Sequence, residues 1–269
     1  MKSIVSAVLL CMPIFGAVAA ELPPEIVKNG LKVAIVPNYP PMDFKDPATG
    51  QLTGLDVDLG EAIGKKLGIK ILWQETRFDQ MMPAIATGRV DAIMSAMTDY
   101  KSRQETATFV DYIRSGPQFF TGKSREAEFA DMKALCGKKV GASRRTNFPK
   151  EIEAWSEANC AGNAVQLVGT EGSADARTQL RQGRIDAAVQ GSETLPYIME
   201  QEPNTFAPIG KAFSTQYTGI ALPVKEQALH DAVRGALDAL IADGSYKAIL
   251  DKWKLPDSAL DKALVNAGQ

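Results

Sequence analysis

The apolar residues of the chain fall into short continuous runs that alternate with stretches of helical spacing. The run LKVAIV at 31–36 ends at a proline and a turn-rich segment, which is typical of a strand that leads into an exposed loop. Apolar positions within 59–67 share one helical face, and the run at 69–73 follows as a second strand. The segment 78–85 repeats the helical spacing. This alternation predicts an α/β protein.

A five-residue pattern occurs twice along the chain, as GRVDA at 88–92 and as GRIDA at 183–187. Each copy follows a stretch of helical spacing and opens an apolar run. The segments that begin at Lys32 and Lys139 are also alike, because each is a short apolar run leading into a turn that contains Asn and Pro. The repetition predicts two similarly built lobes with a cleft between them.

Two β-prone segments, 116–122 and 217–223, bracket the second copy of the pattern. A pair of strands in these positions predicts a two-strand hinge. Amphipathic segments at 229–241 and 246–253 predict helices that return to the first lobe. We therefore expect a signal peptide at 1–20, lobe 1 in 21–117 and 218–269, and lobe 2 in 118–217.

The first twenty residues have the features of a secretory signal peptide. Lys2 is followed by the apolar run 4–20, which ends in small residues. Cys11 follows the bulky Leu10, where a lipoprotein signal needs a small residue, so we expect cleavage near Glu21 without lipidation. This interpretation places the mature protein in the periplasm.

Composition excludes several function classes. The chain has 30 Lys and Arg against 32 Asp and Glu, a balance that argues against a nucleic-acid partner. Cys136 and Cys160 remain after signal cleavage, and an even pair in an oxidising compartment predicts a disulfide. The single histidine, His230, supports neither a metal site nor a His-based catalytic triad. We expect no metal and no cofactor.

Several segments together resemble periplasmic solute-binding proteins of family 3, which serve amino-acid ABC transporters. They are NYPPMDF at 38–44, GLDVDL at 54–59, GRVDAIMSAMT at 88–98 with Arg103, and FVDY at 109–112. The resemblance covers nearly the whole mature chain. It implies a two-lobed clamp of the type II periplasmic-binding-protein class, which closes on a small ligand and presents it to a membrane permease. We expect a monomer.

Arg103 is the first candidate for ligand binding. The pair Thr98-Asp99 predicts a helix N-cap, which would place Arg103 one turn into a helix beside free backbone N–H groups. A guanidinium can hold a carboxylate through two hydrogen bonds, and the resemblance implies that Arg103 binds the ligand α-carboxylate. The alternative is a surface arginine paired with Glu105 or Asp99.

The resemblance implies further ligand contacts from both lobes. Tyr39 follows the first strand, where an aromatic ring can cover a ligand side chain. Asp43 and Asp56 are acids that can meet a basic ligand, or else solvated or capping residues. Beside Arg103 in lobe 1 we expect Ser95 and Thr98, and from lobe 2 Thr146 and Asn147.

The chain departs from the family pattern at two places. Gly191 stands where the family usually has an Asp that binds the ligand ammonium. Either Glu193 or another acid replaces that Asp, or the ligand lacks a standard α-amine. Gly191→Asp should strengthen binding of ordinary α-amino acids if this position faces the cleft. Arg144 and Arg145 stand in a turn where the family commonly has a small residue. An arginine facing the cleft would favour an anionic group, whereas outward-facing arginines would be ordinary solvated charges.

Three functions compete. The first is a transport receptor without enzymatic activity, which binds an amino acid or related small carboxylate by closure of the lobes. The second is a lyase resembling cyclohexadienyl dehydratase on the same scaffold, with Glu193 as general acid. The third is an accessory binding protein of a periplasmic dehydrogenase or sensor.

Overall fold

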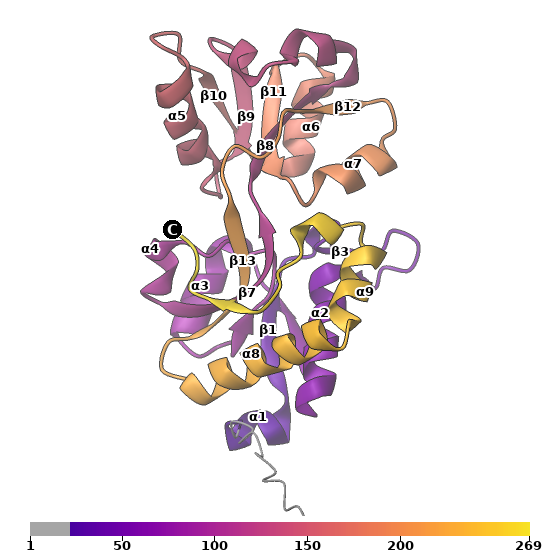
Figure 1. Cartoon of the computed structure of the whole chain (residues 1–269), viewed down its shortest axis with the longest axis vertical. Helices are drawn as coiled ribbons and strands as arrows, with labels where there is room; N and C mark the ends of the chain where they lie inside the picture. The colour runs from indigo at the N-terminus through magenta and orange to yellow at the C-terminus, as the bar shows by residue number, and fades with distance from the viewer. Residues whose placement is uncertain (1–21) are drawn as a thin grey trace, which may run out of the picture.

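A computed structural model describes residues 22–269, which form two lobes joined by a pair of extended strands (Figure 1). The lower lobe in this view contains both ends of the described chain, and the upper lobe contains its middle. We call them lobe 1 and lobe 2. The predicted signal peptide at 1–20, with Cys11, lies outside the described residues.

Lobe 1 is built on a mixed six-stranded sheet in the order β14-β7-β13-β6-β1-β5. Strand β1 lies parallel to β5 and β6, whereas β13 pairs antiparallel with β6 and β7. The sheet strands are β1 (Leu31–Ile35), β5 (Ile71–Glu75), β6 (Ala92–Ile93), β7 (Ala107–Ser115), β13 (Gln216–Pro223) and β14 (Leu264–Val265), and a small antiparallel sheet contains β2 (Asn38–Tyr39), β3 (Asp43–Lys45) and β4 (Leu52–Thr53).

Lobe 2 is built on a five-stranded sheet in the order β10-β9-β11-β8-β12. Its central strand β11 is parallel to β9 and antiparallel to β8. The strands are β8 (Pro117–Gly122), β9 (Lys139–Ser143), β10 (Gln166–Thr170), β11 (Ala187–Gly191) and β12 (Phe206–Ile209).

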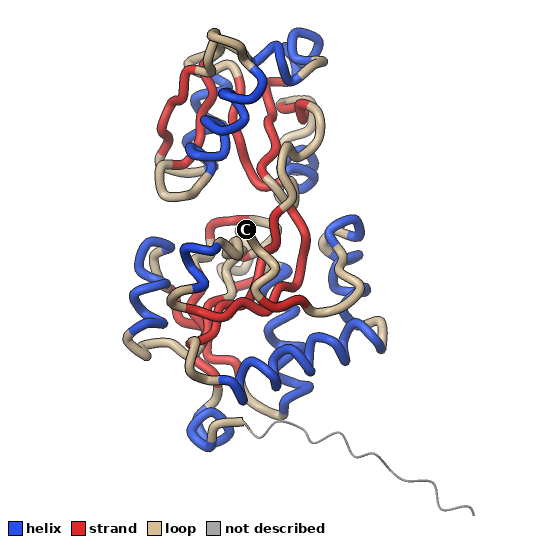
Figure 2. Tube along the Cα trace, turned by 60° about the vertical axis from the view of Figure 1, so that its left-hand side comes forward, coloured by secondary structure: helices blue, strands red, loops and turns tan. Residues whose placement is uncertain are grey.

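Helices cover the sheets of both lobes (Figure 2). Apolar faces of α2, α8 and α9 pack with strands of lobe 1 in one cluster of buried side chains. Lobe 1 contains α1 (Pro24–Asn29), α2 (Leu55–Leu67), α3 (Phe78–Ala86), α4 (Lys101–Gln104), α8 (Gln227–Ala242), α9 (Ser245–Lys252) and the 3₁₀ turn η3 (Pro256–Ser258). Lobe 2 contains α5 (Phe148–Asn159), α6 (Ser173–Arg181), α7 (Leu195–Gln201) and the 3₁₀ turns η1 (Lys123–Phe129) and η2 (Met132–Leu135).

The two copies of the repeated pattern have the same structural role in the two lobes. In lobe 1 the Asp91 carboxylate accepts a hydrogen bond of 2.9 Å from the backbone N–H of Lys32, where β1 begins. In lobe 2 the Asp186 carboxylate accepts one of 2.8 Å from the backbone N–H of Lys139, where β9 begins. The repeat therefore marks equivalent strand junctions in two similar lobes.

The chain passes between the lobes at two adjacent points. Strand β7 leads into β8 through Gly116, and β13 pairs with β7 from Gln216 opposite Ser115. A Cβ at Gly116 would lie 1.9 Å from the carbonyl oxygen of Ser214, so the close approach of the two crossing segments requires glycine. The segment from Pro117 to Ile209 forms the whole lobe 2 sheet without interruption.

Other features concern the chain as a whole. Cys136 and Cys160 form the disulfide expected from the sequence, which ties the end of η2 to the end of α5. Within residues 22–269, no helix combines the length and apolar character needed to cross a membrane. The same residues include no group of three or more His, Cys, Asp or Glu side chains placed to hold a metal ion.

Candidate binding cleft

A cavity of about 520 Å³ lies between the lobes beside the hinge strands. Its walls come from loops that follow β1 and β6 in lobe 1 and β9, β10 and β11 in lobe 2. These are the carboxyl ends of the parallel strands, where open α/β sheets commonly bind ligands. All eight residues expected at the ligand line this cavity: Tyr39, Ser95, Thr98, Arg103, Thr146, Asn147, Gly191 and Glu193. Their roles in binding stay predictions.

Arg103 lies on the lobe 1 wall between two aromatic rings. Its guanidinium carbon is 5.6 Å from the ring centre of Phe78 and 5.1 Å from that of Tyr100, and Nη1 donates a 2.6 Å hydrogen bond to the Thr98 carbonyl. Burial lowers the pKa of this guanidinium, which nevertheless stays charged at neutral pH. Among the described residues no carboxylate forms an ion pair with it. The sequence alternative, a surface pair with Glu105 or Asp99, is therefore not what the structure shows.

The helix that carries Arg103 is shorter than the sequence predicts. Helix α4 begins at Lys101 and is preceded by Tyr100, so the proposed N-cap at Thr98-Asp99 is wrong. The Asp99 carboxylate instead accepts hydrogen bonds from the Gly268 backbone at 2.7 Å and from the Gln104 amide at 2.8 Å. Arg103 thus lies in the short helix α4, and the C-terminal tail holds the segment before this helix through Asp99.

Asp43 and Asp56 are fully buried and do not line the cavity, so neither is placed to meet a ligand. Asp43 accepts a 2.8 Å hydrogen bond from the Ser95 hydroxyl, and Asp56 accepts a 2.7 Å bond from the backbone N–H of Ala96. Ala96 has a φ of 47°, an unusual conformation that the bond to Asp56 helps to hold. Burial raises the pKa of Asp56 to about 7, and burial together with Asp56 raises that of Asp43. The two acids therefore hold the loop at Ser95 and Ala96 from the side that faces away from the cavity.

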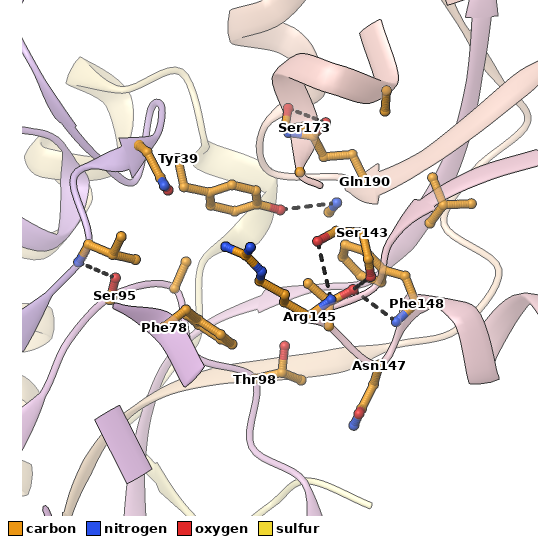
Figure 3. A pocket seen from close by; sticks show the side chains of 18 of the residues that line it. Tyr39, Phe78, Ser95, Thr98, Ser143, Arg145, Asn147, Phe148, Ser173 and Gln190 are labelled. Atoms are coloured by element: carbon orange, nitrogen blue, oxygen red, sulfur yellow. Dashed lines mark hydrogen bonds between the residues drawn. The ribbon is translucent and has the colours of Figure 1, made fainter. Parts of the chain in front are cut away.

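Tyr39 reaches from lobe 1 to the end of β11 in lobe 2. Its hydroxyl donates to Glu193 Oε1 at 3.2 Å and accepts from the Gly191 N–H at 3.2 Å (Figure 3 shows the latter). The Glu193 side chain fills the space beside Gly191, because a Cβ on that glycine would lie 2.0 Å from Glu193 Oε1. Glu193 thus places its carboxylate in the space that a side chain at position 191 would need.

The Glu193 carboxylate has one unused oxygen. The residue is 5 % exposed, and Oε2 is buried without a hydrogen-bond partner among the described residues. Burial raises the pKa of this carboxyl group. An unpaired buried carboxylate oxygen is costly, so a donor from a bound ligand would be favourable here.

The loop between β9 and α5 contributes the lobe 2 wall. Thr146 donates a 2.9 Å hydrogen bond to the Ser143 carbonyl, and Asn147 precedes α5 without capping it through its side chain. Arg145 lines the cavity, whereas Arg144 does not. Figure 3 shows the Arg145 guanidinium extending toward Tyr39 and Phe78 of lobe 1. The two arginines therefore differ, and only the second faces the cleft.

Several cavity residues were not expected from the sequence. Phe78 and Tyr100 hold the Arg103 guanidinium, while the Ser173 hydroxyl donates a 2.7 Å hydrogen bond to the side-chain oxygen of Gln190. The helical spacing of 78–85 assigned Phe78 to the core. Phe78 follows the end of β5 by three residues and begins α3. This position after a strand end is the one signal in the sequence that Phe78 lies at the cleft.

The chain was compared with families and proteins of known type. The family model for bacterial extracellular solute-binding proteins, family 3, matches residues 31–256. The arginine-binding protein ArgT of Corynebacterium glutamicum is 28% identical over 93% of this chain and 82% of its own length. The L-cystine-binding protein TcyJ of Escherichia coli K12 is 30% identical over 84% of this chain and 83% of its own.

A solved structure agrees with these sequence relatives. It is an ancestral amino-acid-binding protein, AncCDT-1, described as a precursor of cyclohexadienyl dehydratase. It superimposes with a TM-score of 0.74 at 28% identity, covering 85% of this chain and 97% of its own. The expected type II two-lobed fold is confirmed by this likeness.

Proposed function

The chain belongs to the bacterial extracellular solute-binding proteins of family 3, and we propose that it is the receptor of an ABC importer for an amino acid or a related small carboxylate. The observation that carries this proposal is Arg103. It is a half-buried guanidinium on the cleft wall, and no described acid forms an ion pair with it. A buried charge of this kind needs an anionic partner. A ligand carboxylate supplies one.

Lobe 1 has the groups needed to bind that carboxylate. Arg103 uses Nη1 on the Thr98 carbonyl, which fixes the plane of the guanidinium, and its remaining N–H groups are available for the ligand. Thr98 also lines this wall of the cavity. The Ser95 hydroxyl already donates to Asp43 and accepts from Val36, so Ser95 contributes mainly by shaping the loop.

The ligand ammonium would bind at Glu193. Its free Oε2 can accept from an ammonium, and its Oε1 is already held by Tyr39. The carboxylate thereby replaces the Asp that the family usually has at the position of Gly191. Arg103 in lobe 1 and Glu193 in lobe 2 would bind the two ends of an α-amino acid, so that binding favours closure of the lobes.

Closure would take place about the paired segments at Gly116 and Gln216. Side chains already bridge the lobes near the cleft: the Tyr100 hydroxyl donates to Glu151 at 3.3 Å, and Gln216 donates to the same carboxylate at 2.7 Å. The closed form would be the one presented to a membrane permease. A secretory signal at 1–20 and the disulfide support a periplasmic location.

Arg103→Ala tests the proposal. The purified mature protein, starting at Glu21, would be titrated calorimetrically with the common L-amino acids and with amine-free carboxylates. We expect the substitution to weaken binding of the best ligand about a hundredfold or more, since it removes charge-assisted hydrogen bonds to the carboxylate. Arg77→Ala is the matched control, because Arg77 also lines the cavity but is paired with Asp79 at 3.2 Å. Equal affinities of the wild type and Arg103→Ala would contradict the proposal.

One observation favours a second candidate. Glu193 is a buried carboxyl group with a raised pKa in the cleft, which is the property of a general acid. A lyase related to cyclohexadienyl dehydratase would use it to eliminate water and carbon dioxide from a cyclohexadienyl carboxylate. Formation of an aromatic product, followed by ultraviolet absorbance and lost in Glu193→Gln, would identify this activity. Ligand binding without turnover is what the receptor function predicts.

A further inference from the structure

Arg144 and Arg145 are adjacent in sequence but have different surroundings. The Arg144 guanidinium donates to Glu171 at 2.6 Å and to the Gly169 carbonyl at 2.8 Å. Its aliphatic part also covers Gly169, since a Cβ there would lie 2.7 Å from Arg144 Cγ. Arg144 is therefore held against β10 on lobe 2. Its side chain has a structural role outside the cleft.

Arg145 has one weaker partner. Its Nη2 lies 3.2 Å from Glu171 Oε2, the carboxylate that Arg144 already binds at the shorter distance. One carboxylate thus serves two guanidinium groups. Asp175, the next acid on this wall, accepts from the Glu171 backbone N–H at 3.0 Å and from the Gln179 amide at 3.1 Å. Glu171 and Asp175 are thus engaged, whereas Glu193, the third lobe 2 acid at this cavity, keeps one unpaired oxygen. Arg145 faces the same cavity from another loop.

Arg145 comes from a different loop than the other charged groups that would bind an α-amino acid. Arg103 lies on the wall of lobe 1, and Glu193 lies beside Tyr39 at the end of β11. Arg145 enters from the β9–α5 loop and extends toward Phe78 and Tyr39 (Figure 3). A ligand held by Arg103 and Glu193 would direct its side chain into the remaining part of the cavity, where this third charge lies.

We propose that Arg145 determines specificity by binding a second carboxylate, so that the cleft selects an acidic α-amino acid such as glutamate or aspartate. This inference rests on the proposed receptor function. When the lobes close around the Arg145 guanidinium and exclude water, its attraction to an anion becomes stronger. The same charge repels a cationic ligand side chain such as that of arginine. A neutral amide of the same shape would offer the guanidinium no charge beyond the Glu171 carboxylate that it shares with Arg144.

Isothermal titration of the mature protein with L-glutamate, L-glutamine and L-arginine tests the inference. We expect the wild type to bind glutamate at least about tenfold more tightly than glutamine, the effect of one charge-assisted hydrogen bond, and to bind arginine most weakly. In Arg145→Ala the ratio of the glutamate and glutamine affinities should fall to near one. Lys150→Ala, which removes an exposed positive charge from the adjacent helix, is the matched control and should keep the wild-type ratio.

A second variant is expected to strengthen glutamate binding through Arg145. Glu171→Gln removes the carboxylate that competes for Arg145, so glutamate should bind several-fold more tightly while glutamine binding changes little. Glutamine or arginine binding as tightly as glutamate in the wild type would overturn the inference and leave the receptor function standing. An unchanged ratio in Arg145→Ala would also overturn it. Failure of all common α-amino acids to bind would overturn this inference, and failure of the amine-free carboxylates as well would overturn the receptor function too.

Discussion

At the scale of single residues, the space beside Gly191 decides how this cleft can recognise an amine. The sequence leaves open whether Glu193 or another acid replaces the Asp missing at Gly191, or whether the ligand lacks an α-amine. The structure favours Glu193, because its carboxylate occupies the space beside Gly191. The acid is present but comes from two positions further along the chain.

Gly191→Asp should therefore weaken amino-acid binding. A Cβ at this position lies 2.0 Å from Glu193 Oε1, so the new side chain must displace Glu193 and place a second negative charge beside it. We expect at least about a tenfold loss of affinity, measured by calorimetry with the best amino-acid ligand. Gly235→Asp is the control, since a side chain there meets open space. Tighter binding by Gly191→Asp would show that Glu193 is not the amine-binding group.

Residue patterns predicted the cleft well where the contacts are local, and poorly where they join distant segments. Tyr39 was expected at the cleft from its place after the first strand and Ser95 and Thr98 from the family resemblance, and all three line the cavity. Asp99 was misread as part of a helix cap because its actual partner, the Gly268 N–H, lies far along the chain. Sequence spacing carries no information about such a partner.

At the scale of elements, the repeated pattern is explained by the strand junctions it forms. Each copy begins with a left-handed glycine, Gly88 with φ 69° and Gly183 with φ 65°, which ends the preceding helix. Each Asp then binds the first N–H of a neighbouring parallel strand. The sequence predicted two similar lobes correctly, because both features are local to the pattern. The strand order could not be read from it.

The disulfide should stabilise lobe 2 without affecting ligand binding. It closes a loop with a sequence separation of 24 residues between η2 and the end of α5. Neither cysteine lines the cavity. Replacing both cysteines by alanine should lower the free energy of unfolding by about 3 kcal/mol, because the unfolded chain regains freedom.

Urea unfolding and calorimetric titration of the double alanine variant check both parts of this prediction. The wild type under oxidising conditions is the reference. A change in ligand affinity larger than about twofold with an intact fold would show that the bridge also shapes the cleft.

At the scale of the whole molecule, several buried carboxyl groups act together on stability. Burial raises the pKa of Asp56 and of Asp111 to about 7, and it also raises the pKa values of Asp43 and Glu193. For an acid with a raised folded-state pKa, the stabilising contribution is fully present below its unfolded pKa near 4 and is lost as the pH rises through the folded value. The ligand-free protein should therefore be less stable at pH 8 than at pH 5.

Thermal unfolding without ligand at pH 5, 6, 7 and 8 measures this loss, which we expect to amount to several degrees. Asp43→Asn removes one of the charges but keeps an oxygen that can accept from Ser95, so the dependence on pH should become shallower. Surface acids with lowered pKa values, such as Asp243, change the stability of the protein only at pH values below 5. A melting temperature that is constant or rises from pH 5 to pH 8 would contradict the raised pKa values of these buried groups.

The two-point connection between the lobes has an evolutionary consequence. Lobe 2 is a single continuous segment, and its ends meet at the neighbouring strands β7 and β13. The guanidinium assigned to the common carboxylate lies in lobe 1, whereas Arg145 and Glu193 both lie in lobe 2. A recombination event with one crossover at each hinge point therefore exchanges the whole of lobe 2 as a unit. The two points are far apart in sequence but adjacent in the structure. A lineage could acquire a new nutrient preference in one step while retaining the surface and carboxylate anchor of its first lobe.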